Sequence, residues 1–452
     1  MGLTRYHCEF AYLGGDEAVA DVAVVVEDGR VKGVERGVAP ASADVALRGL
    51  TLPGFANAHS HAFHRVLRGR AERPGTFWSW RDEMYAVAAV LDPDLYRRLA
   101  RAVYAEMVLA GFSAVGEFHY LHHGPEGRRY EDPNEMGLAL CEAAKDAGIR
   151  LTLLDTCYLE RAPGEKATGV QERYSDSDVA AWAERVEALQ AVVPGAGVRV
   201  GAAAHSLRAV PPPTAGEVAA WAASHDAPFH IHVSEQPAEN DAVAAAYGGS
   251  PVALLSEVGA LGPSTTAVHA THLHPTGAGT LGASRTTVCM CPTTERALGD
   301  GIGVAATLAR EGCPIALGTD SHAVIDPFEE ARALELDERL ESGARGRFTT
   351  AALLQSATSA GHAAIGWPGA GRIEPGAPAD LVTVSLSSVR LAGADRTTLL
   401  EHAVFAACAA DITDVVVSGR RAVAEGRHQL VDDVPGELAS VIGEVARLAE
   451  AR

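Results

Sequence analysis

The chain has 452 residues, of which 47% are hydrophobic and 21% charged, a composition typical of a globular protein that can bury a large core without disulfides. Acidic residues outnumber basic residues by 58 to 38, and a net charge of −20 disfavours binding to nucleic acid or to an anionic membrane. Disordered, collagen-like and coiled-coil proteins are thereby excluded, and any anionic ligand would need a local cluster of arginines.

The cysteines are odd in number and are scattered along the chain, mostly in apolar runs. Free cysteines of this kind are typical of a reducing compartment. The first residues lack the basic start, apolar run and cleavage site of a signal peptide, and no apolar stretch reaches the length of a membrane span. We therefore expect a cytoplasmic protein with no membrane and no nucleic-acid partner.

Both ends of the chain carry short apolar segments separated by turn residues. Residues 21–34 predict a hairpin with its turn at Asp28-Gly29, and residues 378–385 and 414–423 are also typical of strands. Neither end is long enough to form a stable hydrophobic core alone. We expect residues 1–49 and 371–452 to pair into one small β-sandwich domain, with a terminal helix in the second part.

The middle of the chain, residues 50–370, repeats a helical pattern, a glycine and a buried apolar run. The helical period of residues 97–110, for example, ends at Gly111, and an apolar run follows from Ala114. Repeats of this kind predict βα units and a parallel sheet. Eight strands are expected to begin near residues 54, 114, 150, 198, 228, 265, 286 and 314. A (β/α)8 barrel is the simplest closure of eight such units.

Side chains that can bind a metal lie at the ends of several predicted strands, on the face where barrel active sites form. His59 and His61 are two residues apart on the first strand, so both imidazoles can reach one ion. His232 ends the fifth strand, and Asp320 ends the eighth. Imidazoles with one carboxylate are typical of a zinc-like ion that keeps a position for water and lowers its pKa to about 7. We expect one divalent ion per chain, Zn²⁺ or, as the alternative, Fe²⁺.

Two further residues at these strand ends can take part in proton transfer. Glu235 follows His232 by three residues and can carry a proton between the water and a leaving group. His269 ends the sixth strand and can polarise the group under attack or hold the water. A His-x-His pair alone is weak evidence, and it is the arrangement at successive strand ends that gives this prediction its weight.

These motifs resemble the amidohydrolase superfamily, and within it the mononuclear deaminase branch. Residues 53–61, His232 with Glu235, His269, and residues 319–322 carry the resemblance, which spans the whole chain. It implies a barrel flanked by a small β domain that is built from both chain ends. Binuclear members use a carboxylated lysine on strand four, and residues 198–205 contain no lysine, so one metal is expected.

Longer segments resemble the formimidoylglutamate deiminases, a family in that branch. The segments are residues 57–65, 77–82, 116–123, 205–210, 232–239 and 320–322. The resemblance implies hydrolysis of N-formimino-L-glutamate to N-formyl-L-glutamate and ammonia, a step of histidine degradation, through attack of metal-bound hydroxide on the formimino carbon. It also implies a homodimer.

The same resemblance gives each candidate residue a role. The implied metal ligands are His59, His61, His232 and Asp320, and the implied catalytic residues are Glu235, His269 and Asp320. The residues implied to surround the substrate are Arg81, Tyr120, Arg208, His64 and His205. Arginine forks match carboxylates in bidentate fashion, and the substrate carries two carboxylates. His322 is a candidate for supporting the ligating carboxylate. The family pattern has Gln at the position of His64, which leaves the contact made there open.

Two other functions stay open at this point. A deaminase of the same superfamily that acts on a neutral ring, such as guanine or a triazine, would need a flat apolar pocket rather than arginines near the metal. A catalytically silent barrel used for assembly would need no ligands, and the intact ligand set argues against it.

Overall fold

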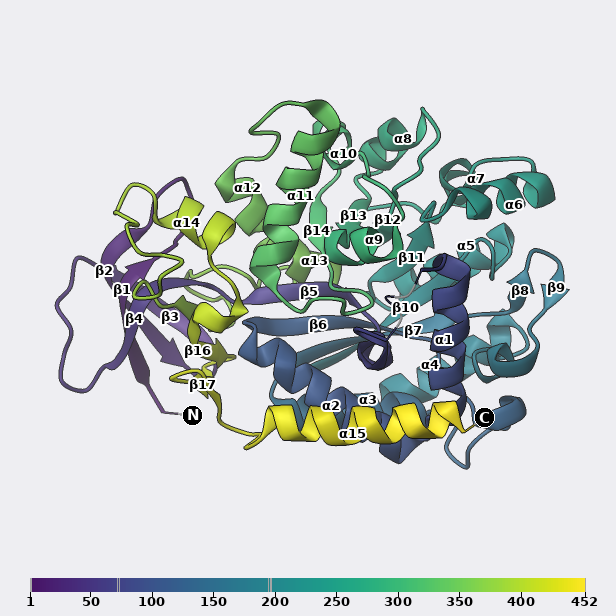
Figure 1. Cartoon of the computed structure of the whole chain (residues 1–452), viewed down its shortest axis with the longest axis horizontal. Helices are drawn as coiled ribbons and strands as arrows, with labels where there is room; N and C mark the ends of the chain where they lie inside the picture. Colours follow the sequence, from purple (N-terminus) through teal and green to yellow (C-terminus); the bar gives the residue numbers. More distant parts are fainter. Residues whose placement is uncertain (1, 71, 73, 194, 196, 452) are drawn as a thin grey trace.

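The computed structural model describes residues 2–70, 72, 74–193, 195 and 197–451 (Figure 1). Its two large sheets have eight strands each, and one of them is parallel throughout. Within the described residues, no helix is long and apolar enough to cross a membrane. The cysteines of the chain are free, and most of them are buried.

The parallel sheet forms a barrel whose strands begin within two residues of the predicted positions. The strands are β5 (Phe55–Ser60), β6 (Phe112–His119), β7 (Arg150–Cys157), β10 (Val198–Ser206), β11 (Phe229–Val233), β12 (Thr265–His269), β13 (Thr287–Met290) and β14 (Ile315–Leu317). A parallel bridge between Ser60 and Asp320 joins the two edges, since Asp320 N–H donates to the His59 carbonyl at 3.0 Å. The predicted (β/α)8 barrel is confirmed.

Helices surround the barrel and connect its strands (Figure 1). They are α1 (Phe77–Val90), α2 (Pro93–Leu109), α3 (Glu135–Ala147), α4 (Val179–Val192), α5 (Pro212–Ser224), α6 (Pro237–Tyr247), α7 (Pro251–Glu257), α8 (Gly277–Ala283), α9 (Pro292–Leu298), α10 (Ala305–Arg310), α11 (Pro327–Ser342), α12 (Thr350–Gln355) and α13 (Gly361–Ala364). The helix α3 ends as its sequence predicts, because Gly148 adopts φ 74° and closes the last turn. A short 3-10 helix, η1 (Ala62–Leu67), follows β5 directly.

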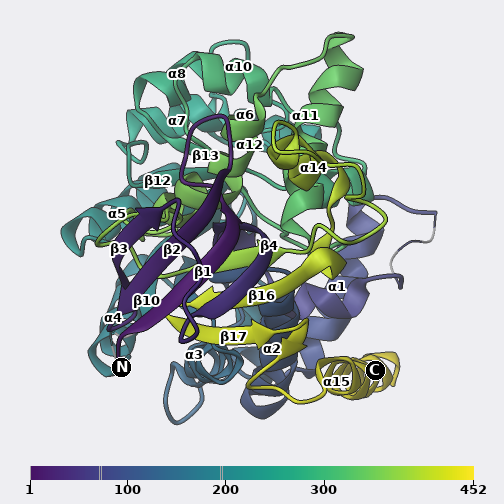
Figure 2. The ribbon, with the colours of Figure 1, turned by 90° about the vertical axis from the view of Figure 1, so that its left-hand side faces the viewer.

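The second sheet is built from both ends of the chain, as predicted. Its strands are β1 (Thr4–Ala11), β2 (Val19–Glu27), β3 (Arg30–Arg36), β4 (Val45–Pro53), β15 (Leu381–Val384), β16 (Ile412–Val417), β17 (Arg420–Ala424) and β18 (Arg427–His428). N-terminal β4 pairs antiparallel with C-terminal β15, and Figure 2 shows strands of the two ends side by side. The sheet bends over on itself, so that Arg30 at the start of β3 bridges to Pro378. Asp28 and Gly29 form the β2–β3 turn with φ values of 48° and 78°, which fits the predicted hairpin.

Two more helices lie in the C-terminal part of the chain, α14 (Leu399–Ala406) and α15 (Val434–Glu450). The terminal helix α15 runs beside α2 on the outside of the barrel (Figure 1). Arg98 on α2 pairs with Glu444 on α15 at 2.9 Å, and Arg101 pairs with Glu437. The last helix therefore ties the C-terminal end of the chain to the barrel.

Candidate active site

Polar side chains converge where the barrel strands end. His59 lies on β5, His232 on β11 and His269 on β12, while Asp320 lies three residues beyond β14. Three overlapping groups of side chains at this face could each hold a metal ion, and together they comprise His59, His61, His64, His232, His269 and Asp320. The barrel thus brings together every ligand that the sequence predicts.

The distances within this group fit one metal ion. His59 Nε2 lies 3.1 Å from His232 Nε2, and Asp320 Oδ1 lies 3.5 Å from His59 Nε2 and 3.3 Å from His61 Nε2. With metal–ligand bonds of about 2.0–2.1 Å, neighbouring ligand atoms of a tetrahedral site are roughly 3.3 Å apart. The donor set and its spacing therefore fit a zinc-like ion.

The protonation of these imidazoles also suits metal binding. Burial lowers the pKa of His59, His61 and His232 well below the usual range, so the rings are neutral. His61 Nδ1 donates to the Phe118 carbonyl at 2.9 Å, and His232 Nδ1 donates to the His205 carbonyl at 2.8 Å. These bonds fix the tautomer in which Nε2 has a lone pair for the ion.

His269 and Glu235 lie beside the ligand cluster. His269 Nε2 is 3.8 Å from Glu235 Oε1 and 3.9 Å from Asp320 Oδ2. Burial alone would lower the pKa of His269, but the surrounding carboxylates outweigh it and raise that pKa well above its usual range. Burial raises the pKa of Glu235 to about 7, and His269 opposes part of this shift. A carboxyl group with such a pKa can exchange a proton near neutral pH.

The backbone is strained at three of these strand ends. Ser234 has φ 54°, His269 has φ 70° and Asp320 has φ 42°, all in the left-handed region that side chains rarely adopt. Each such residue costs about 1–3 kcal/mol and persists where the surrounding structure fixes it. Strain of this kind collects at functional sites, which agrees with the position of the ligand cluster.

A small cavity of about 50 Å³ opens onto the cluster, and all predicted substrate residues line it: Arg81, Tyr120, Arg208, His64 and His205. Aromatic side chains form much of the remaining wall: Phe77, Trp80, Tyr85, Tyr158 and Tyr174. Helix α1 contributes three of these aromatic residues, so it covers one side of the cavity.

The two arginines of the cavity are half-buried and make no direct salt bridge with a described carboxylate. Neither Arg81 nor Arg208 makes a hydrogen bond or ion pair with a described residue, and the Nε atom of Arg81 is buried without a partner. The Arg81 guanidinium stacks on the ring of Trp78 at 4.4 Å and on Tyr85 at 5.4 Å.

The charge of Arg208 opposes the rise in pKa of Glu235 and Glu239, but it does so without a direct contact. Charges that are partly removed from water are normally paired. Two half-buried guanidinium groups without a salt bridge, beside the potential metal ligands, therefore favour an anionic ligand.

The remaining predicted residues lie in or behind the same site. His64 Nε2 and the Tyr120 hydroxyl share a hydrogen bond of 2.8 Å. His322 lies behind the cluster, where its ring nitrogens contact the hydroxyl groups of Ser60 at 3.2 Å and Thr319 at 2.8 Å. Ser60 stands between His59 and His61, and Thr319 precedes Asp320, so His322 supports the backbone that carries these potential ligands.

Two carboxylates of the site escaped the sequence analysis. Glu117 on β6 accepts hydrogen bonds of 2.6 Å from the Ser60 hydroxyl and from the Ala62 N–H, which fixes the chain after β5. Glu295 on α9 accepts from His269 Nδ1 at 3.3 Å and so orients that ring. Glu117 is a carboxylate within a buried strand, which is a signal that the sequence contains, whereas Glu295 lies in α9, beyond the end of β13, and has no such signal.

A second cluster, His119, His122 and Asp155, is also compact enough for a metal ion. Its carboxylate is already engaged, because Arg185 donates to Asp155 at 2.8 Å and to Asp176 at 2.7 Å. All five side chains are buried. The cluster is therefore an ion-pair network that supports β7 and α4.

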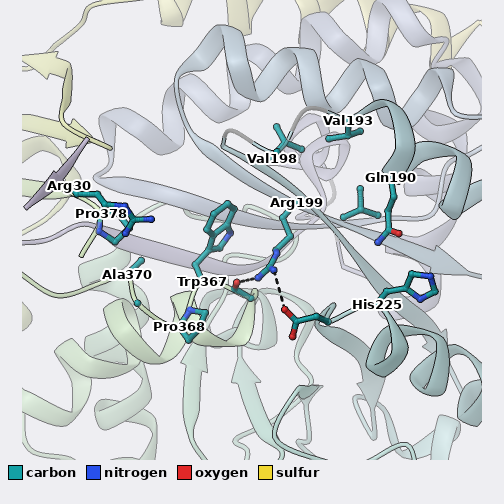
Figure 3. A pocket seen from close by; sticks show the side chains of 15 residues that line it. Arg30, Gln190, Val193, Val198, Arg199, His225, Trp367, Pro368, Ala370 and Pro378 are labelled. Carbon is teal, nitrogen blue, oxygen red and sulfur yellow. Dashed lines mark hydrogen bonds and ion pairs between the residues drawn. The ribbon is translucent and has the colours of Figure 1, made fainter. Parts of the chain in front are cut away.

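A larger cavity of about 510 Å³ lies at the N-terminal end of β10, opposite the strand ends that carry the ligands (Figure 3). Its Arg199 guanidinium donates to the Gly366 carbonyl and lies over Trp367 at 5.6 Å. Among the described residues, none of the groups that could hold a metal ion includes a residue that lines this larger cavity. The candidate active site is therefore the smaller cavity.

Comparison with known proteins agrees with this geometry. The model of the Amidohydrolase family matches residues 50–422, which include the whole barrel. The chain belongs to this family. Membership accounts for the barrel, for the flanking sheet and for the potential metal ligands at the strand ends, and it makes the chain a hydrolase that acts on C–N bonds.

Two curated relatives and one solved structure show the range of this similarity. Formimidoylglutamate deiminase of Pseudomonas aeruginosa is 37% identical over 418 residues, 90% of this chain and 92% of the relative. 8-Oxoguanine deaminase of the same organism is 30% identical over 428 residues, 90% of this chain and 91% of the relative. The crystal structure of an amidohydrolase from Brucella melitensis is 33% identical, with a TM-score of 0.91 over 98% of this chain and 100% of that one.

Proposed function

We propose that this amidohydrolase is a formimidoylglutamate deiminase, which hydrolyses N-formimino-L-glutamate to N-formyl-L-glutamate and ammonia. The observation that carries the proposal is the presence of two half-buried guanidinium groups without a salt bridge, those of Arg81 and Arg208, in the cavity that opens onto the potential metal ligands. The similarity to the Pseudomonas aeruginosa formimidoylglutamate deiminase supports it.

The charge of the substrate matches the cavity. N-formimino-L-glutamate carries two carboxylates, and each can accept a pair of hydrogen bonds from one arginine fork. The Tyr120 hydroxyl and the rings of His64 and His205 line the same cavity and offer further polar contacts. A neutral ring such as guanine or a triazine would leave both guanidinium groups half-buried without a salt bridge, which is unfavourable. The cavity therefore favours the linear dianion over the ring.

His59, His61, His232 and Asp320 would hold one divalent ion, for which we propose Zn²⁺ with Fe²⁺ as the alternative. When bound, the ion supplies Lewis-acid chemistry that lowers the pKa of a water molecule to about 7 and makes it a nucleophile near neutral pH. Asp320 Oδ1 faces His59 and His61 and would hold the ion with them, while its Oδ2 faces His269, so this carboxylate could also accept a proton from the attacking water.

The other residues move protons and hold the reacting groups. Glu235 can transfer a proton from the water to the leaving nitrogen, because its Oε1 lies 3.8 Å from His269 at the edge of the cluster. Glu295 holds His269 so that Nε2 points toward Glu235 and Asp320, where it can stabilise the oxygen of the water. A C–O bond forms at the formimino carbon and the bond to the terminal nitrogen breaks. That nitrogen takes both protons of the water and leaves as ammonia.

The reaction belongs, on this proposal, to histidine degradation. The homodimer and the cytoplasmic location expected from the sequence stay predictions.

Product identification tests the proposal. The zinc-loaded protein is incubated with N-formimino-L-glutamate and, in parallel, with N-formimino-L-aspartate and guanine. Proton NMR then follows the formyl signal, and an enzymatic assay measures ammonia. We expect one N-formyl-L-glutamate and one ammonia per substrate consumed. Absence of both products with protein that contains its metal would contradict the proposed substrate.

A further inference from the structure

The predicted substrate residue His64 has a position that substrate binding alone does not explain. It lies in η1, which begins directly after His61, and only 3% of its surface is exposed. Its Nε2 shares a hydrogen bond of 2.8 Å with the Tyr120 hydroxyl. Its Nδ1 is buried and has no hydrogen-bond partner among the described residues. A buried ring nitrogen without a partner is unfavourable, so the site is expected to supply one.

The geometry shows which partner is near. A ring nitrogen of His64 lies within 4.8 Å of donor atoms of His61 and of Asp320, and all three side chains are buried. His61 Nε2 and Asp320 Oδ1 are 3.3 Å apart and belong to the set that fits one ion. The rings of His61 and His64 also lie close together, with centroids 4.5 Å apart. An ion held by His61 and Asp320 therefore has the His64 ring as its immediate neighbour.

We propose that His64 is an additional ligand of the metal centre, which then has four imidazole donors and one carboxylate. The inference rests on the metal centre of the proposed function but not on its substrate. A fifth protein donor raises the affinity for the ion and favours metals that accept five or six ligands.

Metal binding without substrate tests the proposal, so the result is independent of the proposed reaction. The wild-type protein, His64→Gln and Tyr120→Phe are compared by zinc competition with a chromogenic chelator and by the visible absorption of the Co²⁺-loaded proteins. Tyr120→Phe is the matched control, because it removes the hydrogen bond at Nε2 of His64 and leaves both ring nitrogens in place. Thermal unfolding of the metal-free proteins verifies that each variant folds.

If His64 is a ligand, His64→Gln weakens zinc binding by about 10-fold or more and strengthens the visible Co²⁺ bands, which are more intense at lower coordination number. Tyr120→Phe leaves zinc affinity within about threefold of wild type, with an unchanged Co²⁺ spectrum. If His64 acts only by positioning Tyr120, both variants retain wild-type zinc affinity and Co²⁺ spectra, and the proposal is wrong.

X-ray absorption of the zinc-loaded wild-type protein decides the question even if His64→Gln does not fold. It counts the imidazole ligands of the ion directly. Four imidazoles support the assignment of His64, and three overturn it.

Discussion

Replacement of Arg208 by methionine removes a guanidinium group from the cavity while it retains most of the aliphatic side chain. In the ligand-free protein Arg208 has no hydrogen bond or ion pair with a described residue. Its loss therefore breaks no direct contact, although it removes a positive charge that opposes the rise in pKa of Glu235 and Glu239. We expect the variant to fold, with a free energy of unfolding within about 0.5 kcal/mol of wild type.

The effect on activity follows from the contacts that Arg208 can make. A bidentate pair with one substrate carboxylate consists of two charge-assisted hydrogen bonds, each worth about 1.5 kcal/mol at the lower end of the usual range. Their loss amounts to about 3 kcal/mol. Since about 1.4 kcal/mol corresponds to a factor of ten, kcat/KM for N-formimino-L-glutamate should fall roughly 150-fold.

The assay follows ammonia release by the zinc-loaded proteins. Arg98→Met is the matched control, because Arg98 makes exposed ion pairs on α2 with Asp94 and Glu444, away from the cavity. A second comparison uses formimino compounds that lack one of the two carboxylates. Arg208→Met should lose its effect on the compound that lacks the carboxylate bound by Arg208. Activity of Arg208→Met within about threefold of wild type would refute the assigned contact.

Three further predictions concern proton transfer, stability and pH. Glu235→Gln should lower kcat by about 10²–10⁴-fold with unchanged zinc content by atomic absorption, and near-normal turnover would exclude Glu235 as the proton carrier. Arg185→Met should lower the free energy of unfolding in urea by about 3–5 kcal/mol, because it leaves Asp155 and Asp176 buried and unpaired; a loss below about 1 kcal/mol would contradict this. Burial would raise the pKa of both aspartates, but Arg185 outweighs it and lowers them. Their contribution to wild-type stability is therefore present above about pH 4 and lost as pH falls further, and an acid titration of unfolding that showed no such loss would contradict the assignment.

The barrel could be predicted because its signals are local. Strands such as β6 and β7, which are buried along their whole length, are rich in apolar residues, and a glycine such as Gly148 marks the end of the helix before β7. The ligands followed from the same reasoning, since alternate residues of a strand share a face and the C-terminal ends of barrel strands meet. His59 and Asp320 are far apart in the sequence, yet both could be placed at that end.

The supporting contacts could not be predicted, because they depend on how distant segments pack. Glu117 became part of the site only because η1 turns back over β6 and places the Ala62 N–H against its carboxylate. Glu295 depends in the same way on the position of α9 beside β12. Neither the periodicity nor the spacing of the sequence contains these distances. The lack of a salt bridge between Arg81 and a described carboxylate also required the structure, because a sequence does not show which carboxylates remain out of reach.

The central claim is that the metal site and its two half-buried arginines without a salt bridge select a linear dicarboxylate amidine. The most direct test is the ratio of kcat/KM for N-formimino-L-glutamate to that for guanine, measured by ammonia release on one preparation of fully zinc-loaded protein. We predict efficient turnover of N-formimino-L-glutamate and no measurable turnover of guanine. A higher kcat/KM for guanine than for N-formimino-L-glutamate would contradict the account.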